Sequence, residues 1–156
     1  MDLFEKWLKK RENNDLIKRA LVDKSYKTTL SRNKLPEVKT NEDLATVGDA
    51  VVKLCLSEIF IDRCEKLSKT MEQFETDEFF VTRIATRYDL LSFIQYDNED
   101  EKMPKDYNYV KGKKGRNKHK YIATAVEAVI GAIFLETKDM EQIKEFVEMW
   151  TKSGNQ

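Results

Sequence analysis

The chain has 156 residues, of which 36% are charged and 40% hydrophobic, and its 28 basic residues balance its 28 acidic residues. This length suits one domain that buries a core without a disulfide framework, and no apolar run approaches the roughly 20 residues of a membrane-spanning helix. The two cysteines, Cys55 and Cys64, fit neither a zinc-ligand spacing nor a disulfide framework. We therefore expect a soluble intracellular protein, in the cytoplasm, whose attraction to any polyanion comes from local clusters of basic residues.

The first third of the chain predicts two short helices and a loop. The apolar residues of 2–11 fall on one helical stripe, and a second helix follows Asn14, a candidate N-cap. The segment 27–40 lacks periodicity and contains a proline, so we expect a loop there. Thr40 or Asn41 then caps a long, mostly apolar helix.

The remaining two thirds of the chain also read as helices. We expect the long helix to end near residue 64, and further helices over 68–75 and 78–95. An acidic run from Asp97 and a basic stretch after Pro104 predict a loop. An apolar helix, KYIATAVEAVIGAIFLE, and an amphipathic helix over 140–152 complete the chain. The fold class is therefore predicted to be all-α.

Two of these apolar helices carry a carboxylate, Asp49 in the first and Glu127 in the second. An ionised carboxylate buried without a partner costs several kcal/mol, so each acid must find a cation, hydrogen-bond donors or solvent. If both acids face one cleft, magnesium is a natural partner because hard cations take oxygen ligands. The alternative is that each acid pairs with a nearby Lys or Arg, or reaches water from the edge of its helix. Small residues on both helices predict that they pack side by side: Gly48, Ala50, Ala128 and Gly131.

Three segments carry a resemblance to a known family. NEDLATVGDAVVKLCLSEIF resembles the ribonuclease III signature, N-E-x-L-E-x-L-G-D-A-V followed by an apolar helix. YIATAVEAVIGAIFLE is similar to I-L-A-D-A-x-E-A-L-I-G-A-I-Y-L-D, and ALVDKSY is similar to A-L-T-H-K-S-Y. The resemblance implies a ribonuclease III-like helical endonuclease domain over 1–156, with no double-stranded-RNA-binding domain after it.

The resemblance also implies a catalytic site that this chain retains only in part. In the family, two pairs of carboxylates hold magnesium ions that activate a water for cleavage of double-stranded RNA. Asp49 and Glu127 match one member of each pair, whereas the other two positions hold Ala45 and Thr124. Glu42 lies on the same side of the helix and is a possible auxiliary acid. Magnesium binding is therefore expected to be weak or absent.

Association and RNA contact are implied in the same way. Family members usually pair as homodimers through an aromatic residue, and Thr46 stands at that position, so a homodimer or a heterodimer with a related chain remains open. The sole histidine, His119, reads as a loop residue rather than a catalytic base. A basic stretch is the candidate contact for RNA phosphates, with a solvated loop as the alternative. Its basic residues are Lys111, Lys113, Lys114, Arg116, Lys118 and Lys120.

Three functions stay open at this point. The first is a ribonuclease III-like domain that binds structured or double-stranded RNA, or a ribonucleoprotein partner, with catalysis lost or strongly weakened. The second is an atypical magnesium-dependent endoribonuclease, in which Glu42, Asp49 and Glu127 suffice. The third is a helical protein-interaction module that keeps only the fold. Whether the chain is an enzyme depends on Ala45 and Thr124.

Overall fold

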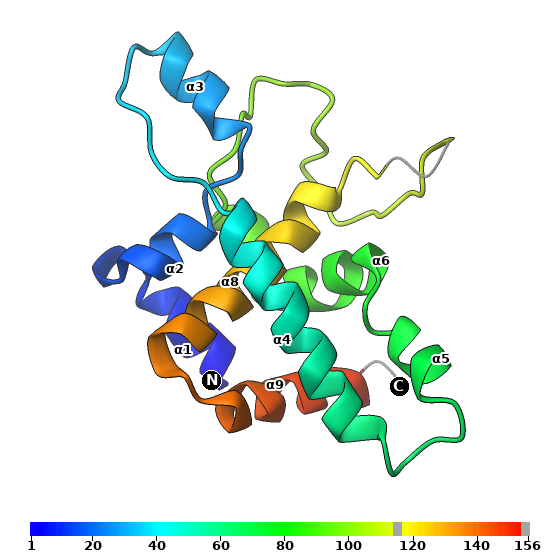
Figure 1. Cartoon of the computed structure of the whole chain (residues 1–156). Helices are drawn as coiled ribbons and strands as arrows, with labels where there is room; N and C mark the ends of the chain where they lie inside the picture. Colours follow the sequence, from blue (N-terminus) through cyan, green and yellow to red (C-terminus); the bar gives the residue numbers. More distant parts are fainter. Residues whose placement is uncertain (114–116, 154–156) are drawn as a thin grey trace.

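The computed structural model describes residues 1–113 and 117–153, and these residues form a helical fold (Figure 1). The described part contains no β-strand, and an isolated bridge joins Val22 to Gln95. The predicted all-α class is thus confirmed. The elements are α1 (Leu3–Lys9), a 3₁₀ turn (Arg11–Asn13), α2 (Asp15–Ala20), α3 (Tyr26–Arg32), α4 (Glu42–Phe60), α5 (Leu67–Glu72), α6 (Asp77–Phe79), a π-helical segment (Phe80–Ala85), α7 (Thr86–Tyr88), a second 3₁₀ turn (Leu90–Ser92), α8 (Lys120–Thr137) and α9 (Met140–Ser153).

Helix α8 is the central element of the core. It contacts α1, α2, α4, α6, α9 and the π-helical segment. A helix that is apolar nearly all round must be covered on nearly all sides. Between Tyr121 and Ile133, every residue of α8 is buried except Thr124 and Glu127, which are partly exposed. These two residues therefore mark the one side on which this stretch of α8 reaches the surface.

Helix α4 packs against α8 through two glycines. A Cβ atom at Gly48 would overlap the backbone carbonyl of Glu127, and one at Gly131 would overlap the backbone carbonyl of Leu44. Each helix thus approaches the backbone of the other, which only residues without a side chain allow. The predicted side-by-side packing of these helices is confirmed. The role expected for Ala50 is wrong, because Ala50 faces solvent.

The predicted loop over 27–40 contains a helix, α3, so this expectation is wrong for residues 27–32. Helix α3 buries Leu30 and is fixed by Asp97 from the far side of the sequence. The carboxylate of Asp97 accepts hydrogen bonds from Thr29 Oγ1, at 3.2 Å, and from both terminal nitrogens of Arg32, each at 3.3 Å. Because Asp97 lies far from α3 in the sequence, no periodic pattern within the segment 27–40 indicates this helix.

The predicted helix over 78–95 is shorter and less regular than expected. Thr76 caps its start by accepting a hydrogen bond from the backbone N–H of Phe79, and a π-helical segment follows. The helix ends after Tyr88, where Asp89 adopts a left-handed backbone with φ 48°. The side chain of Asp89 accepts a hydrogen bond from the hydroxyl of Tyr107 at 2.8 Å. This contact from a distant loop fixes the turn that ends the helix.

Both predicted N-cap residues stand at the start of their helices, but only one of them caps its helix through the side chain. Asn14 caps α2, because its side-chain oxygen accepts a hydrogen bond from the N–H of Ile17 at 3.0 Å. Asn41 precedes α4 but makes no capping hydrogen bond with its side chain. Instead, Asn41 Nδ2 donates to the carbonyl of Ala20 at 3.0 Å and ties α4 to the end of α2.

Helix α9 covers the core as its amphipathic pattern predicts. Ile143, Phe146, Val147 and Trp150 are all buried. Cys55 and Cys64 carry free thiols, as expected from their spacing. Among the described helices, none is both long and apolar enough to cross a membrane.

Replacing Gly131 with alanine tests the contact between α4 and α8. The added methyl group meets fixed backbone atoms of α4, so Gly131→Ala should lower the free energy of unfolding by about 1–3 kcal/mol. Alanine gains about 1 kcal/mol over glycine inside a helix, so the net loss appears only if the steric cost of the added methyl group is larger than this gain. Urea denaturation measures the difference. As a control, Ala50→Leu adds bulk to the exposed side of α4 and should change stability by less than about 0.5 kcal/mol. A stabilised Gly131→Ala protein would contradict the close approach.

Candidate active site

Asp49 lies at the edge of the packed face of α4, one position after Gly48. Its side chain is 49% exposed, and its Oδ2 atom lies 3.1 Å from the Nζ atom of Lys53, one turn further along the helix. Asp49 therefore has both a cationic partner and access to water. The apolar pattern around it comes from the neighbouring buried positions of the same helix: Leu44, Val51, Val52 and Cys55.

Glu127 faces Asp49 from α8. Burial raises the pKa of Glu127 to about 8, and the negative charge of the neighbouring Asp49 adds to this shift. Because the backbone of Glu127 packs directly on Gly48, the residue before Asp49, the two carboxyl groups project from the same contact. The structure thus brings together the two acids that the sequence singled out.

The other positions predicted from the sequence add few oxygen ligands to this pair of acids. Ala45, one turn before Asp49, carries no oxygen, and Thr124, three residues before Glu127, offers a neutral hydroxyl. Glu42 is exposed, and its Oε1 atom accepts a hydrogen bond from Thr40 Oγ1 at 2.9 Å. A rise of 1.5 Å per residue places Glu42 about 10 Å from Asp49 along the helix axis. Glu42 therefore lies too far along α4 to share an ion directly with Asp49.

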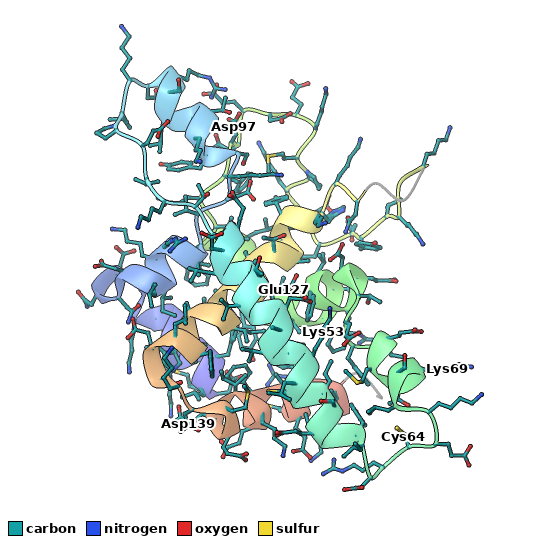
Figure 2. The ribbon with its side chains drawn as sticks, viewed as in Figure 1. Lys53, Cys64, Lys69, Asp97, Glu127 and Asp139 are labelled. Atoms are coloured by element: carbon teal, nitrogen blue, oxygen red, sulfur yellow. The ribbon has the colours of Figure 1, made fainter. Side chains whose placement is uncertain are left out.

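The structure adds three charged residues that sequence reasoning missed. The ammonium of Lys53 contacts Asp49 and lies in the electrostatic field of Glu75 and Glu127. Figure 2 shows Lys53 and Glu127 next to each other beside α4. Asp77, the first residue of α6, acts on Glu127 through its charge. Helical spacing alone relates Lys53 to Asp49, whereas Asp77 and Glu75 come from a separate part of the chain that no local pattern connects to the site.

The donor set of this site is limited. Two carboxylates project from α4 and α8, and one of them already contacts an ammonium group. Within the described ranges, no group of three or more His, Cys, Asp or Glu side chains is arranged to hold a metal ion. Magnesium favours octahedral coordination by oxygen atoms. In this chain, the protein itself supplies few of them.

The basic stretch before α8 is anchored beside the site at its C-terminal end. Lys111, Lys113, Lys118 and Lys120 are exposed, while Lys114 and Arg116 lie outside the described residues. Asn117 Nδ2 donates to Asp77 Oδ2 at 3.0 Å, which ties the end of the stretch to the start of α6. The charge of Lys120 also acts on Glu127.

His119, which the sequence predicted to be a loop residue, is buried and hydrogen-bonded. It directly precedes α8 and is 5% exposed, with its Nε2 atom 3.0 Å from Asp106 Oδ1. Its backbone N–H donates to Asn117 Oδ1 at 2.9 Å. The ring is thus part of the structure that holds the loop against the start of α8.

Thr46 is exposed on α4, and its hydroxyl donates to the carbonyl of Glu42 at 3.2 Å. The side chain therefore bonds to its own helix. Leu54 and Ile61, further along and just after α4, are 49% and 60% exposed. These residues are the apolar surface that this part of the molecule presents to solvent.

This arrangement of helices is that of a known family. The sequence model of the ribonuclease-III-like family matches residues 13–153, so the chain belongs to this family. It is 31% identical over 139 residues to ribonuclease 3 of a Nitratiruptor species and 33% identical over 140 residues to that of Wolinella succinogenes. Each match covers 86% of this chain and 52% or 50% of the relative, so the chain spans about half the length of these curated relatives.

Solved structures agree with this assignment. A crystal structure of the nuclease domain of ribonuclease III from Campylobacter jejuni matches with a TM-score of 0.67 and 25% identity, over 99% of this chain and 97% of that one. A second structure of the same domain, whose description refers to structural flexibility in a region involved in dimer formation, matches with a TM-score of 0.61 and 26% identity, over 96% and 94% of the two chains. The predicted family and fold are confirmed.

The raised pKa of Glu127 predicts how stability depends on pH. Its ordinary pKa is 4.5, so between about pH 4.5 and 8 the folded protein binds more protons than the unfolded chain. Stability therefore falls as pH rises through this window, and the loss is complete above the folded pKa. Glu127→Gln removes the titrating group. Relative to the natural chain, the variant should be similar at pH 5 and more stable at pH 9 by about 1 kcal/mol or more.

Urea denaturation at the two pH values measures this difference. Glu136→Gln, at an exposed position of the same helix, controls for the loss of one carboxylate from α8. A Glu127→Gln effect of equal size at both pH values would mean that burial and the nearby Asp49 do not raise the pKa of Glu127 as described.

Proposed function

We propose that this chain is a ribonuclease III-like domain that binds structured or double-stranded RNA, or a ribonucleoprotein partner, with catalysis lost or strongly weakened. The observation that carries the proposal is the donor set between α4 and α8. Asp49 and Glu127 face each other there, while Ala45 and Thr124 stand where the family resemblance implies two further carboxylates.

The residues present do not fit a catalytic magnesium site. When bound, magnesium would supply a polarised water and stabilise charge on the scissile phosphate. Holding it needs several anionic oxygens in octahedral geometry. This chain offers the carboxylate of Asp49, which Lys53 already neutralises, and the carboxyl of Glu127, whose raised pKa favours its neutral form. We therefore derive no hydrolytic step through the metal.

Support for RNA contact comes from the basic stretch beside the site. Its described lysines are exposed and make no ion pair with a described residue within 4.0 Å, which leaves them able to neutralise phosphates: Lys111, Lys113, Lys118 and Lys120. Proteins recognise A-form RNA mainly through its backbone and 2′-hydroxyl groups, so such contacts carry affinity without sequence readout. The link from Asn117 to Asp77 keeps this stretch near the surface where α4 and α8 meet.

Replacing three of these lysines tests the RNA contact. Lys111→Ala, Lys113→Ala and Lys118→Ala together should weaken binding of duplex RNA by about tenfold or more. They should also reduce the slope of log affinity against log salt, because binding with fewer phosphate contacts releases fewer counterions. Filter binding at several salt concentrations measures both quantities.

A matched control removes three exposed lysines from α1 and the turn after it. Lys6→Ala, Lys9→Ala and Lys10→Ala change the net charge equally but lie on another part of the molecule (Figure 1). They should leave the slope nearly unchanged. Equal losses in both triple variants would show that affinity follows net charge alone, and the basic stretch would then be a solvated loop.

Restoring the missing acids tests the proposed loss of catalysis. The unmodified chain should bind duplex RNA in the presence of a chelator and cut it slowly or not at all with magnesium. Ala45→Glu with Thr124→Asp places acids one turn before Asp49 and three residues before Glu127, where helical spacing lets paired side chains converge. This double variant should bind magnesium more tightly and cut duplex RNA at least about tenfold faster. A gel-based cleavage assay with magnesium or manganese compares the two proteins.

The cleavage assay and the filter-binding measurement together separate the two remaining functions. The observation that favours the atypical magnesium-dependent endoribonuclease is that two further acids act on this site through their charges, Glu75 on Lys53 and Asp77 on Glu127. Brisk magnesium-dependent cutting by the unmodified chain would establish that function and overturn ours. Absence of any affinity for structured RNA would instead favour a helical protein-interaction module.

Self-association belongs to the same proposal. Thr46 provides no aromatic anchor, so any homodimer or heterodimer with a related chain would use other exposed residues of α4 such as Leu54. The molar mass of the purified chain from light scattering decides whether it pairs with itself. The organisation of residues 1–156 as one domain stays a prediction.

A further inference from the structure

Lys53 is the cation that contacts the acid pair directly. It lies 3.1 Å from Asp49 across one helical turn, and both side chains are about half exposed, at 54% and 49%. An exposed pair at this spacing on one helix is usually a weak surface interaction. What sets Lys53 apart is that the charges of two acids from other elements, Glu75 and Glu127, also act on its ammonium group.

These acids come from three parts of the fold. Asp49 belongs to α4, Glu127 to α8, and Glu75 to the segment between α5 and α6. The hydrogen bond to Asp49 raises the pKa of Lys53, and the charges of Asp49, Glu75 and Glu127 raise it further. Lys53 therefore holds its charge against the carboxylate of Asp49, the acid that α4 contributes to its contact with α8.

We infer that the Lys53 ammonium is the resident cation of this site and competes with divalent metal ions for Asp49. The inference rests on the proposed function, since it concerns the same residues. An ammonium bound to Asp49 Oδ2 uses an oxygen that a metal ion would coordinate, and its positive charge repels a nearby dication. The chain thus differs from a metal-binding arrangement by an added cation as well as by missing acids.

This competition has consequences that the missing acids alone do not have. Adding carboxylates at positions 45 and 124 increases the attraction for a metal ion but leaves Lys53 on Asp49. The largest gain in metal affinity should therefore require both changes. The gain from removing Lys53 should also shrink at high ionic strength, because salt screens repulsion between charges near the surface.

The test is calorimetric titration with magnesium, and in parallel manganese, on the full chain. The deciding comparison is made in the Ala45→Glu/Thr124→Asp background, where affinity is highest. Adding Lys53→Met, which keeps the side-chain length and removes the charge, should raise metal affinity by about tenfold or more at low salt. Lys53→Arg keeps the charge and should give no such gain.

Lys9→Met is the matched control. Lys9 pairs with Glu5 at 3.5 Å with the same order and spacing on α1, and its side chain is 56% exposed. Removing this lysine changes the net charge equally and should leave metal affinity unchanged. Thermal unfolding of each variant verifies that all of them fold, which is expected because Lys53 is exposed.

Each result distinguishes the inference from the proposed function. Equal metal affinity with and without Lys53→Met, in a background that binds metal, would overturn the inference and leave the RNA-binding proposal intact. Equal gains from Lys53→Met and Lys9→Met would show an effect of net charge and would overturn it as well. No metal binding by any variant would overturn the inference, because Lys53 would then have no metal ion to compete with, and it would leave the RNA-binding proposal intact.

Discussion

The contact between the backbones of α4 and α8 determines the rest of this structure. Gly48 lies against the carbonyl of Glu127, and Gly131 lies against the carbonyl of Leu44. At this separation, side chains that flank the contact must face each other or turn to solvent. Asp49 follows Gly48 and Glu127 lies at the contact itself, so close packing brings the two carboxyl groups together. The position of the candidate site is therefore a consequence of the core.

Two acids held this close must reduce their mutual repulsion. Family members, by the resemblance, do so with metal ions between four carboxylates. Here the structure shows two other means, because Lys53 pairs with Asp49 and the raised pKa of Glu127 favours its neutral form. Both acids are thus compatible with the fold when no metal is bound. Their presence in an apolar helix follows from packing and pairing alone, which is why they do not by themselves indicate activity.

Sequence reasoning found what depends on local pattern and missed what depends on distant partners. The apolar runs of α4 and α8 predicted both helices and their packing, and the three motifs predicted the family. Helix α3 was missed because Asp97, which holds Thr29 and Arg32, lies far away in the sequence. The early end of the helix at Tyr88 depends on Tyr107 in the same way. At the site, Lys53 was detectable from its spacing to Asp49, whereas Glu75 and Asp77 were not.

The position of Lys53 also bears on how such a site changes over time. Losing a carboxylate from a metal site leaves the remaining acids without their counter-charge, which raises the free energy of the folded state. A lysine one turn after Asp49 supplies a counter-charge from within the same helix, at little conformational cost. Once Lys53 is present, a carboxylate regained at position 45 or 124 faces a site that already contains a positive charge. A tethered ammonium thus stabilises the fold and, on the inference above, disfavours a return to metal binding.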